Sequence, residues 1–168
     1  MITAYQAPPM DHSHMPGDLI ERAKRLLAEA GYDAKRPLRI TLRHVSGNEE
    51  KRVNLAVAGM WRQLGVQTQL QQGTMNAHFA DLRQGDFDVA WAGWIGESNA
   101  EHYLGLLASD VGEVNYGAYH SAEFDQLIQQ ARTHANVQSR NNLLQQAEAV
   151  ALREAPVVPL YLSLIHIS

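Results

Sequence analysis

The sequence contains no cysteine, and this is compatible with an oxidising compartment. It has no apolar run that approaches the ~20 residues that an α-helix needs to cross a bilayer, so we expect no direct membrane insertion. Its formal net charge of −4 comes from charges of both signs. This balance gives no basic footprint for nucleic acid or for an anionic membrane, and we predict that neither is a partner.

The sequence also lacks a G-x-S-x-G motif, a P-loop and a G-x-G-x-x-G motif, and nothing pairs a nucleophile with a base. We therefore predict no enzyme activity and no cofactor. His12 and His14 could face one side of an extended segment, but no acidic or cysteine partner follows at ligand spacing, so we predict no metal site. One alternative is a metal-dependent hydrolase that uses the scattered histidines with Asp86 or Asp88, two acids that we interpret as turn and helix-cap residues. A ligand-free structural module is another alternative.

Helical and strand patterns alternate along the chain. Residues 1–17 hold three of the six prolines and predict an extended loop. Predicted helices span residues 18–30, 53–64, 76–83, 100–107, 121–133 and 137–153, and predicted strands span residues 38–42, 66–71, 87–94 and 157–162. Strand–helix–strand order with short connections favours parallel pairing. The predicted fold class is α/β, with a mixed, largely parallel sheet flanked by helices.

The most informative strand pattern is the apolar run at residues 87–94. It is entered through the turn Gly85-Asp86 and followed by Trp94 and Glu97, and its flanking turn signals predict a strand buried on both faces. Ligands of open α/β sheets bind at the carboxyl ends of the strands. An indole and a carboxylate at this end suit a ligand with a flat or apolar part and a cationic part.

Four motifs carry a family resemblance. They are, in chain order, Leu26-Leu27-Ala28-Glu29-Ala30-Gly31-Tyr32, Phe87-Asp88-Val89 with Ala92-Gly93-Trp94, Ser121-Ala122-Glu123-Phe124-Asp125-Gln126-Leu127-Ile128, and Ala155-Pro156-Val157-Val158-Pro159-Leu160-Tyr161. Together they resemble the extracytoplasmic oligopeptide- and dipeptide-binding proteins of ABC importers, solute-binding family 5. Members are much longer than this chain. The resemblance therefore implies that residues 18–162 are a partial C-terminal, larger lobe, and that 163–168 are a truncation tail.

The resemblance also implies ligand-binding residues. Family members are similar in lining the peptide pocket with a tryptophan at Trp94, and Glu97 stands where an aspartate meets the α-ammonium of the peptide. Asn99 could hydrogen-bond the same end of the ligand, or could instead cap the helix that follows. Trp91 replaces a basic residue that binds the ligand carboxylate, which argues against selection by charge there and leaves a core role open. We interpret Met75, at an often aromatic position, as a core residue that fills a gap.

The function that the resemblance implies is that of a periplasmic receptor. Its two lobes would close about a peptide and deliver it to the membrane subunits of an ABC importer. The first residues, from Met1, have neither a basic nor an apolar signal region, so we expect any export signal to lie upstream of them.

Overall fold

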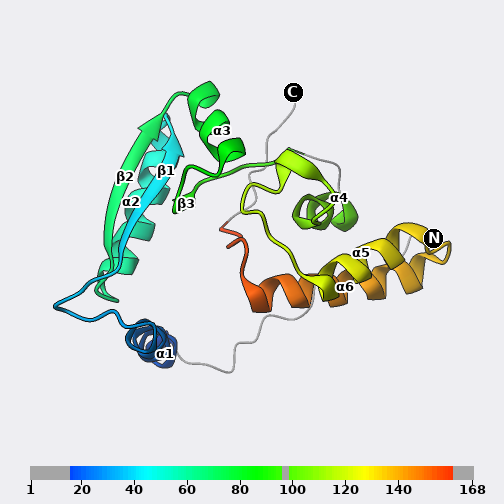
Figure 1. The fold of residues 1–168 in the computed structure, drawn as a ribbon, viewed down its shortest axis with the longest axis horizontal. Coiled ribbons are helices and arrows are strands. Elements are labelled where there is room, and N and C mark those ends of the chain that lie inside the picture. Colours follow the sequence, from blue (N-terminus) through cyan, green and yellow to red (C-terminus); the bar gives the residue numbers. More distant parts are fainter. Residues whose placement is uncertain (1–15, 96–98, 161–168) are drawn as a thin grey trace. The chain divides into compact units, whose positions relative to one another are not determined.

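The computed structural model describes residues 16–95 and 99–160, and the chain divides into two compact units between Trp94 and Ile95. Residues 16–94 belong to one unit, here called the sheet unit, and residues 95–160 belong to the other, the helical unit (Figure 1). Residues 1–15 of the loop predicted at 1–17 and the tail predicted at 163–168 lie outside the described residues, as do His12 and His14, whereas residues 16–17 belong to a helix and not to a loop.

The sheet unit begins with α1, Pro16–Glu29. Its first residue is a proline, which is well suited to this position because the missing N–H would have no partner there. The helix starts two residues before the predicted start at Asp18. It ends at Glu29, one residue before the predicted end at residue 30, and Gly31, which follows, has a left-handed φ of 85°. The N–H of Tyr32 donates to the carbonyl of Leu27 and that of Gly31 to Ala28, the two bonds of a Schellman motif.

Three parallel strands follow: β1, Arg39–Val45; β2, Gln67–Gly73; and β3, Val89–Ala90. Their order is β2-β1-β3, with β1 in the centre. The crossover helices are α2, Asn48–Arg62, and α3, Met75–Gln84 (Figure 1). Because the two crossovers run in opposite directions across β1, right-handed connections place α2 and α3 on opposite faces of the sheet. The predicted α/β class and parallel pairing are confirmed.

The prediction of a strand buried on both faces over residues 87–94 is wrong. Strand β3 covers only Val89 and Ala90 of this range, and both are half-buried because β3 lies at an edge of the described sheet. Residues 92–95 are exposed. The predicted last strand is also absent from its described part, residues 157–160; its remaining two positions lie outside the described residues. Two prolines in the short segment 156–159 remove backbone donors that a strand would need there.

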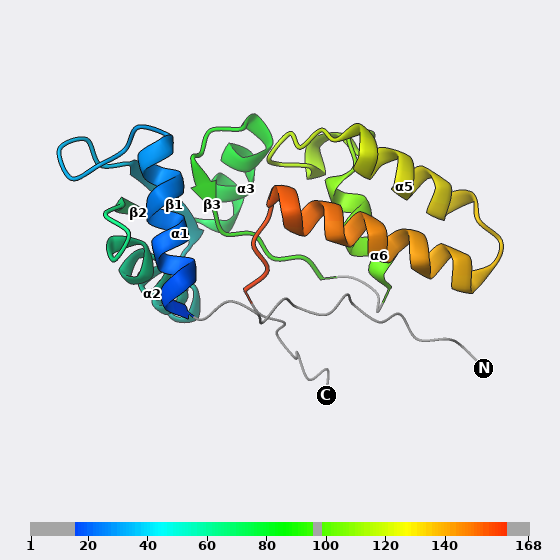
Figure 2. The ribbon, with the colours of Figure 1, turned by 90° about the horizontal axis from the view of Figure 1, so that it is seen from below.

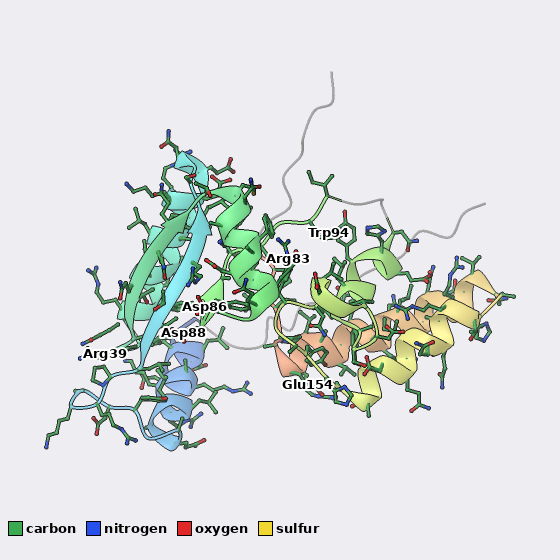
Figure 3. All side chains as sticks on the ribbon, turned by 45° about the horizontal axis from the view of Figure 1, so that its top comes forward. Arg39, Arg83, Asp86, Asp88, Trp94 and Glu154 are labelled. Atoms are coloured by element: carbon green, nitrogen blue, oxygen red, sulfur yellow. The ribbon has the colours of Figure 1, made fainter. Side chains whose placement is uncertain are left out.

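A polar network attaches the turn before β3 to the central strand. The Arg43 guanidinium pairs with Asp81 on α3 and, at 2.8 Å, with Asp86. The Asp88 carboxylate accepts a hydrogen bond of 2.8 Å from the N–H of Thr41. Asp86 and Asp88 thus bind β1, and the predicted helix cap is wrong; Figure 3 shows both residues.

The described part of the helical unit contains three short segments before its main hairpin. They are the helix α4, Ala100–Leu104, and two 3₁₀ turns, η1, Gly105–Leu107, and η2, Gly112–Val114. The hairpin consists of α5, Ala122–Thr133, and α6, Val137–Glu154, which lie side by side (Figure 2). Ser121 and Asn136 cap them, each accepting from a backbone N–H with its side-chain oxygen. The core of this unit is apolar: Ala108, Phe124, Ile128, Ala131, Leu144, Ala147, Val150 and Ala151.

Candidate ligand-binding site

The candidate site begins at the carboxyl edge of the parallel sheet, where the strand order reverses at β1. The N–H of Trp91 donates to the carbonyl of Arg43 at 2.8 Å, which extends the pairing of β3 with β1 by one residue. The chain then leaves the sheet through Ala92 and Gly93. Ligands of open α/β sheets bind beyond the carboxyl ends of strands at such a reversal. The segment Trp91–Trp94 therefore lies at the edge where a ligand is expected.

Trp94 presents an indole at this edge. The residue is 43% exposed, which is high for so large an apolar residue, and it is labelled in Figure 3. Trp91 is half-buried instead, consistent with the core role that the sequence left open. The exposed indole can pack against a flat or apolar part of a ligand.

Met75 is the first residue of α3 and follows β2 at the same edge of the sheet. Met75 is 54% exposed, so its interpretation as a core residue is wrong. The sequence could have indicated this, because a residue placed directly after the helix cap Thr74 stands where α3 meets solvent. Met75 is thus a further apolar side chain at the edge that carries Trp94.

The other two predicted site residues follow Trp94 in the chain. Asn99 caps α4, and its side-chain oxygen accepts a hydrogen bond of 3.0 Å from the N–H of Glu101. The helix-cap role that the sequence offered as an alternative for Asn99 is thus what the structure shows. A contact of Asn99 with a ligand stays a prediction. Glu97 lies outside the described residues, so its role also stays a prediction.

The described histidines do not form a metal centre. Among residues 16–95 and 99–160, no three His, Cys, Asp or Glu side chains lie close enough to hold an ion. His44 and His78 are each only 2% exposed, and each has a ring nitrogen at a backbone carbonyl: Nδ1 of His44 at Val45 and Nε2 of His78 at Trp91. Sequence spacing did not reveal these buried contacts, because they depend on how the elements pack.

Comparison with known proteins assigns the family. Residues 2–113 match the model of the bacterial extracellular solute-binding proteins, family 5, middle region, which is more than half of the chain. The chain therefore belongs to the family 5 bacterial extracellular solute-binding proteins, as the sequence motifs indicated.

Particular relatives are similar to this chain over most of its length. The periplasmic oligopeptide-binding protein of Salmonella typhimurium is 35% identical over 84% of this chain and 26% of its own. The probable deoxycholate-binding periplasmic protein of Escherichia coli is 32% identical over 95% of this chain and 30% of its own. The solved structure of the Escherichia coli murein tripeptide-binding protein matches with a TM-score of 0.84 at 30% identity, over 90% of this chain and 30% of that one.

The chain thus spans less than a third of the length of these relatives. The names of all three describe proteins that bind a ligand, and the two curated names place them in the periplasm. No described helix of this chain has the length and apolar character needed to cross a membrane.

Proposed function

We propose that this chain is the ligand-facing part of the larger lobe of a peptide receptor that works in the periplasm with an ABC importer. The observation that carries the proposal is the exposed indole of Trp94 at the carboxyl edge of a parallel sheet, in a chain that belongs to family 5. Among the relatives, the names of two describe binding of oligopeptides or of a murein tripeptide. Residues 18–162 would form one wall of the site, and a second lobe would close over the ligand.

The predicted residues would divide the work of recognition. Trp94 packs against the peptide, and Glu97 accepts a charge-assisted hydrogen bond from its α-ammonium, which is stronger than a neutral one. Asn99 caps α4 with its side-chain oxygen, and its amide N–H₂ group, which is a donor, would hydrogen-bond the same end of the ligand. Closure of the lobes excludes water and strengthens the charge pair.

Calorimetry on a two-lobed receptor that contains this chain tests the role of Glu97. We expect Glu97→Gln to weaken the binding of short peptides by about 1.5–3 kcal/mol, the range for a hydrogen bond to a charged group. N-acetylated peptides, which lack the ammonium, should lose little more in this variant. Glu113→Gln is the matched control, because it removes the same charge from an exposed residue of η2. Equal affinities for wild type and Glu97→Gln would remove Glu97 from the site.

A second measurement tests the two-lobe mechanism. The chain alone supplies one wall of the site, and we expect it to bind short peptides no more tightly than a Kd of about 1 mM, which is roughly −4 kcal/mol. Tryptophan fluorescence follows the titration, because all three tryptophans lie in the sheet unit, which carries the proposed contact residue Trp94. Saturation of a monomeric chain at micromolar peptide would show that one lobe is enough for binding. Binding of deoxycholate and not of peptides would contradict the proposal that the ligand is a peptide.

A further inference from the structure

His78 lies on α3 directly beneath the segment that carries the two site tryptophans. Its side chain is buried, and its Nε2 lies 2.7 Å from the carbonyl oxygen of Trp91. A carbonyl oxygen only accepts, so Nε2 carries the proton and donates this hydrogen bond. The neutral Nε2–H tautomer and the charged imidazolium can both do so.

Trp91 is held from two sides by its backbone. Its N–H donates to Arg43 on β1, while its C=O accepts from His78 on α3. Both peptide groups that flank Trp91 are therefore fixed at the point where the chain leaves the sheet. The partly buried carbonyl would lose this partner if His78 were removed, and an acceptor that lacks both a partner and full access to water is costly.

The indole of Trp91 then determines the course of the next residues. Its ring centroid lies 6.4 Å from that of His78, with the planes tilted by 48°. The far edge of the ring lies against Gly93, where an added Cβ would be only 3.2 Å from Cη2 and 3.4 Å from Cζ2. The close approach favours glycine at this position, and the backbone passes the ring and reaches Trp94.

We propose that His78 is a positioning residue for the ligand site, because it fixes Trp91 and so sets the direction in which Trp94 is presented. This inference rests on the proposed function, in which Trp94 contacts the ligand. The competing explanation is that His78 only fills space, since its ring also meets Phe79 edge-on at 5.3 Å. An apolar side chain of similar size would serve the second role but not the first.

The test compares three variants by the ¹⁵N indole resonances of the chain. We expect His78→Leu, which removes the donor, to move the Trp94 resonance, and His78→Gln to restore it, because a glutamine amide nitrogen stands close to where Nε2 stood. The matched control is His44→Leu, which removes an equally buried imidazole from β1 whose own contact is with Val45. It should leave the Trp94 resonance in place.

The same variants are then titrated with peptide in the two-lobed receptor. His78→Leu should weaken binding about tenfold, the order expected from one lost hydrogen bond, and His78→Gln should recover most of that affinity. If His78→Leu does not fold, His78→Asn replaces it, since its shorter amide cannot reach the carbonyl of Trp91.

Two outcomes would overturn the role of His78: equal Trp94 resonances in His78→Leu and wild type, or an equal displacement in His44→Leu. A wild-type receptor that binds no peptide would refute the proposed function instead. The resonances of the chain would still decide whether His78 positions Trp94.

Discussion

The two units of this chain bury different kinds of residue. In the helical unit, the described buried side chains are apolar and form one core between α4, α5 and α6. In the sheet unit, four buried apolar residues are accompanied by three buried polar ones, His44, Asn54 and His78. Buried polar groups need partners in fixed directions, whereas apolar groups need only volume. Hydrogen bonds therefore specify the geometry of the unit that carries Trp94, and packing specifies the other.

The largest expected effect breaks the packing of the helical unit. Phe124 is fully buried and meets the ring of Tyr119 edge-on at 5.5 Å. Phe124→Ala should lower the free energy of unfolding by about 3–5 kcal/mol, because it removes contacts and leaves a cavity. Urea denaturation followed by circular dichroism measures this loss.

Tryptophan fluorescence adds a comparison between the units, because all three tryptophans belong to the sheet unit. We expect the fluorescence midpoint of Phe124→Ala to stay near that of wild type. Leu152→Ala is the control, since this α6 side chain is 51% exposed and its truncation should cost under about 1 kcal/mol. Equal losses for the two variants would contradict the assignment of Phe124 to the core.

A smaller effect is expected from the ion pairs of the sheet unit. The side chain of Arg43 is 15% exposed, and its partners Asp81 and Asp86 are 32% and 71% exposed. Asp81→Asn should destabilise the fold by about 1–3 kcal/mol, because it weakens a hydrogen bond between charged groups that are largely out of water. Asp86→Asn, the matched variant on the same guanidinium, should cost under about 1 kcal/mol because water screens this pair. Thermal unfolding at constant pH compares the loss of stability in the two variants. A larger loss in Asp86→Asn than in Asp81→Asn would contradict the stronger role given to the pair of Arg43 with Asp81.

The smallest expected effect is a pH dependence within the helical unit. The Tyr119 hydroxyl donates to Glu154 at 2.6 Å, and this bond, followed by that from Arg153, lowers the pKa of Glu154 below its ordinary 4.5. A lowered folded pKa stabilises the unit above pH 4.5, and this contribution is lost as the pH falls through the folded pKa. Melting temperatures of wild type and Tyr119→Phe should converge on acidification. If the difference in melting temperature between the two proteins stays constant from neutral pH to about pH 3, the hydrogen bond from Tyr119 does not couple stability to the protonation of Glu154.

Local signals predicted most of the fold. The helices predicted at 18–30 and 53–64 end just before Gly31 and Gly65, and both glycines have a left-handed backbone near the ends of α1 and α2 in the structure. The length of β3 was not predictable in this way, because an apolar run does not reveal that its strand lies at a sheet edge and ends at Ala90.

For the site, the sequence placed Trp94 at the end of a strand. The strand ends at Ala90 instead, and the structure exposes Trp94 four residues further along the chain. The contacts of His78 and Arg43 were not predictable, since each joins residues that are distant in sequence and meet only after the crossovers have formed. Sequence-spacing rules describe one helix or strand at a time, so they do not predict the contacts between elements that fix the position of a site.

Strand β2 also bears on how this protein can be handled. From Gln67 to Gly73 it contains no charged residue and no proline, and in the described part of the chain no strand pairs with its outer side. An uncharged open edge is a template on which a further chain can add, and glutamine-rich strands stack readily into fibrils. Concentrated preparations should therefore associate first along β2, and a lysine introduced at the exposed Gln69 is the simplest way to keep the chain dispersed.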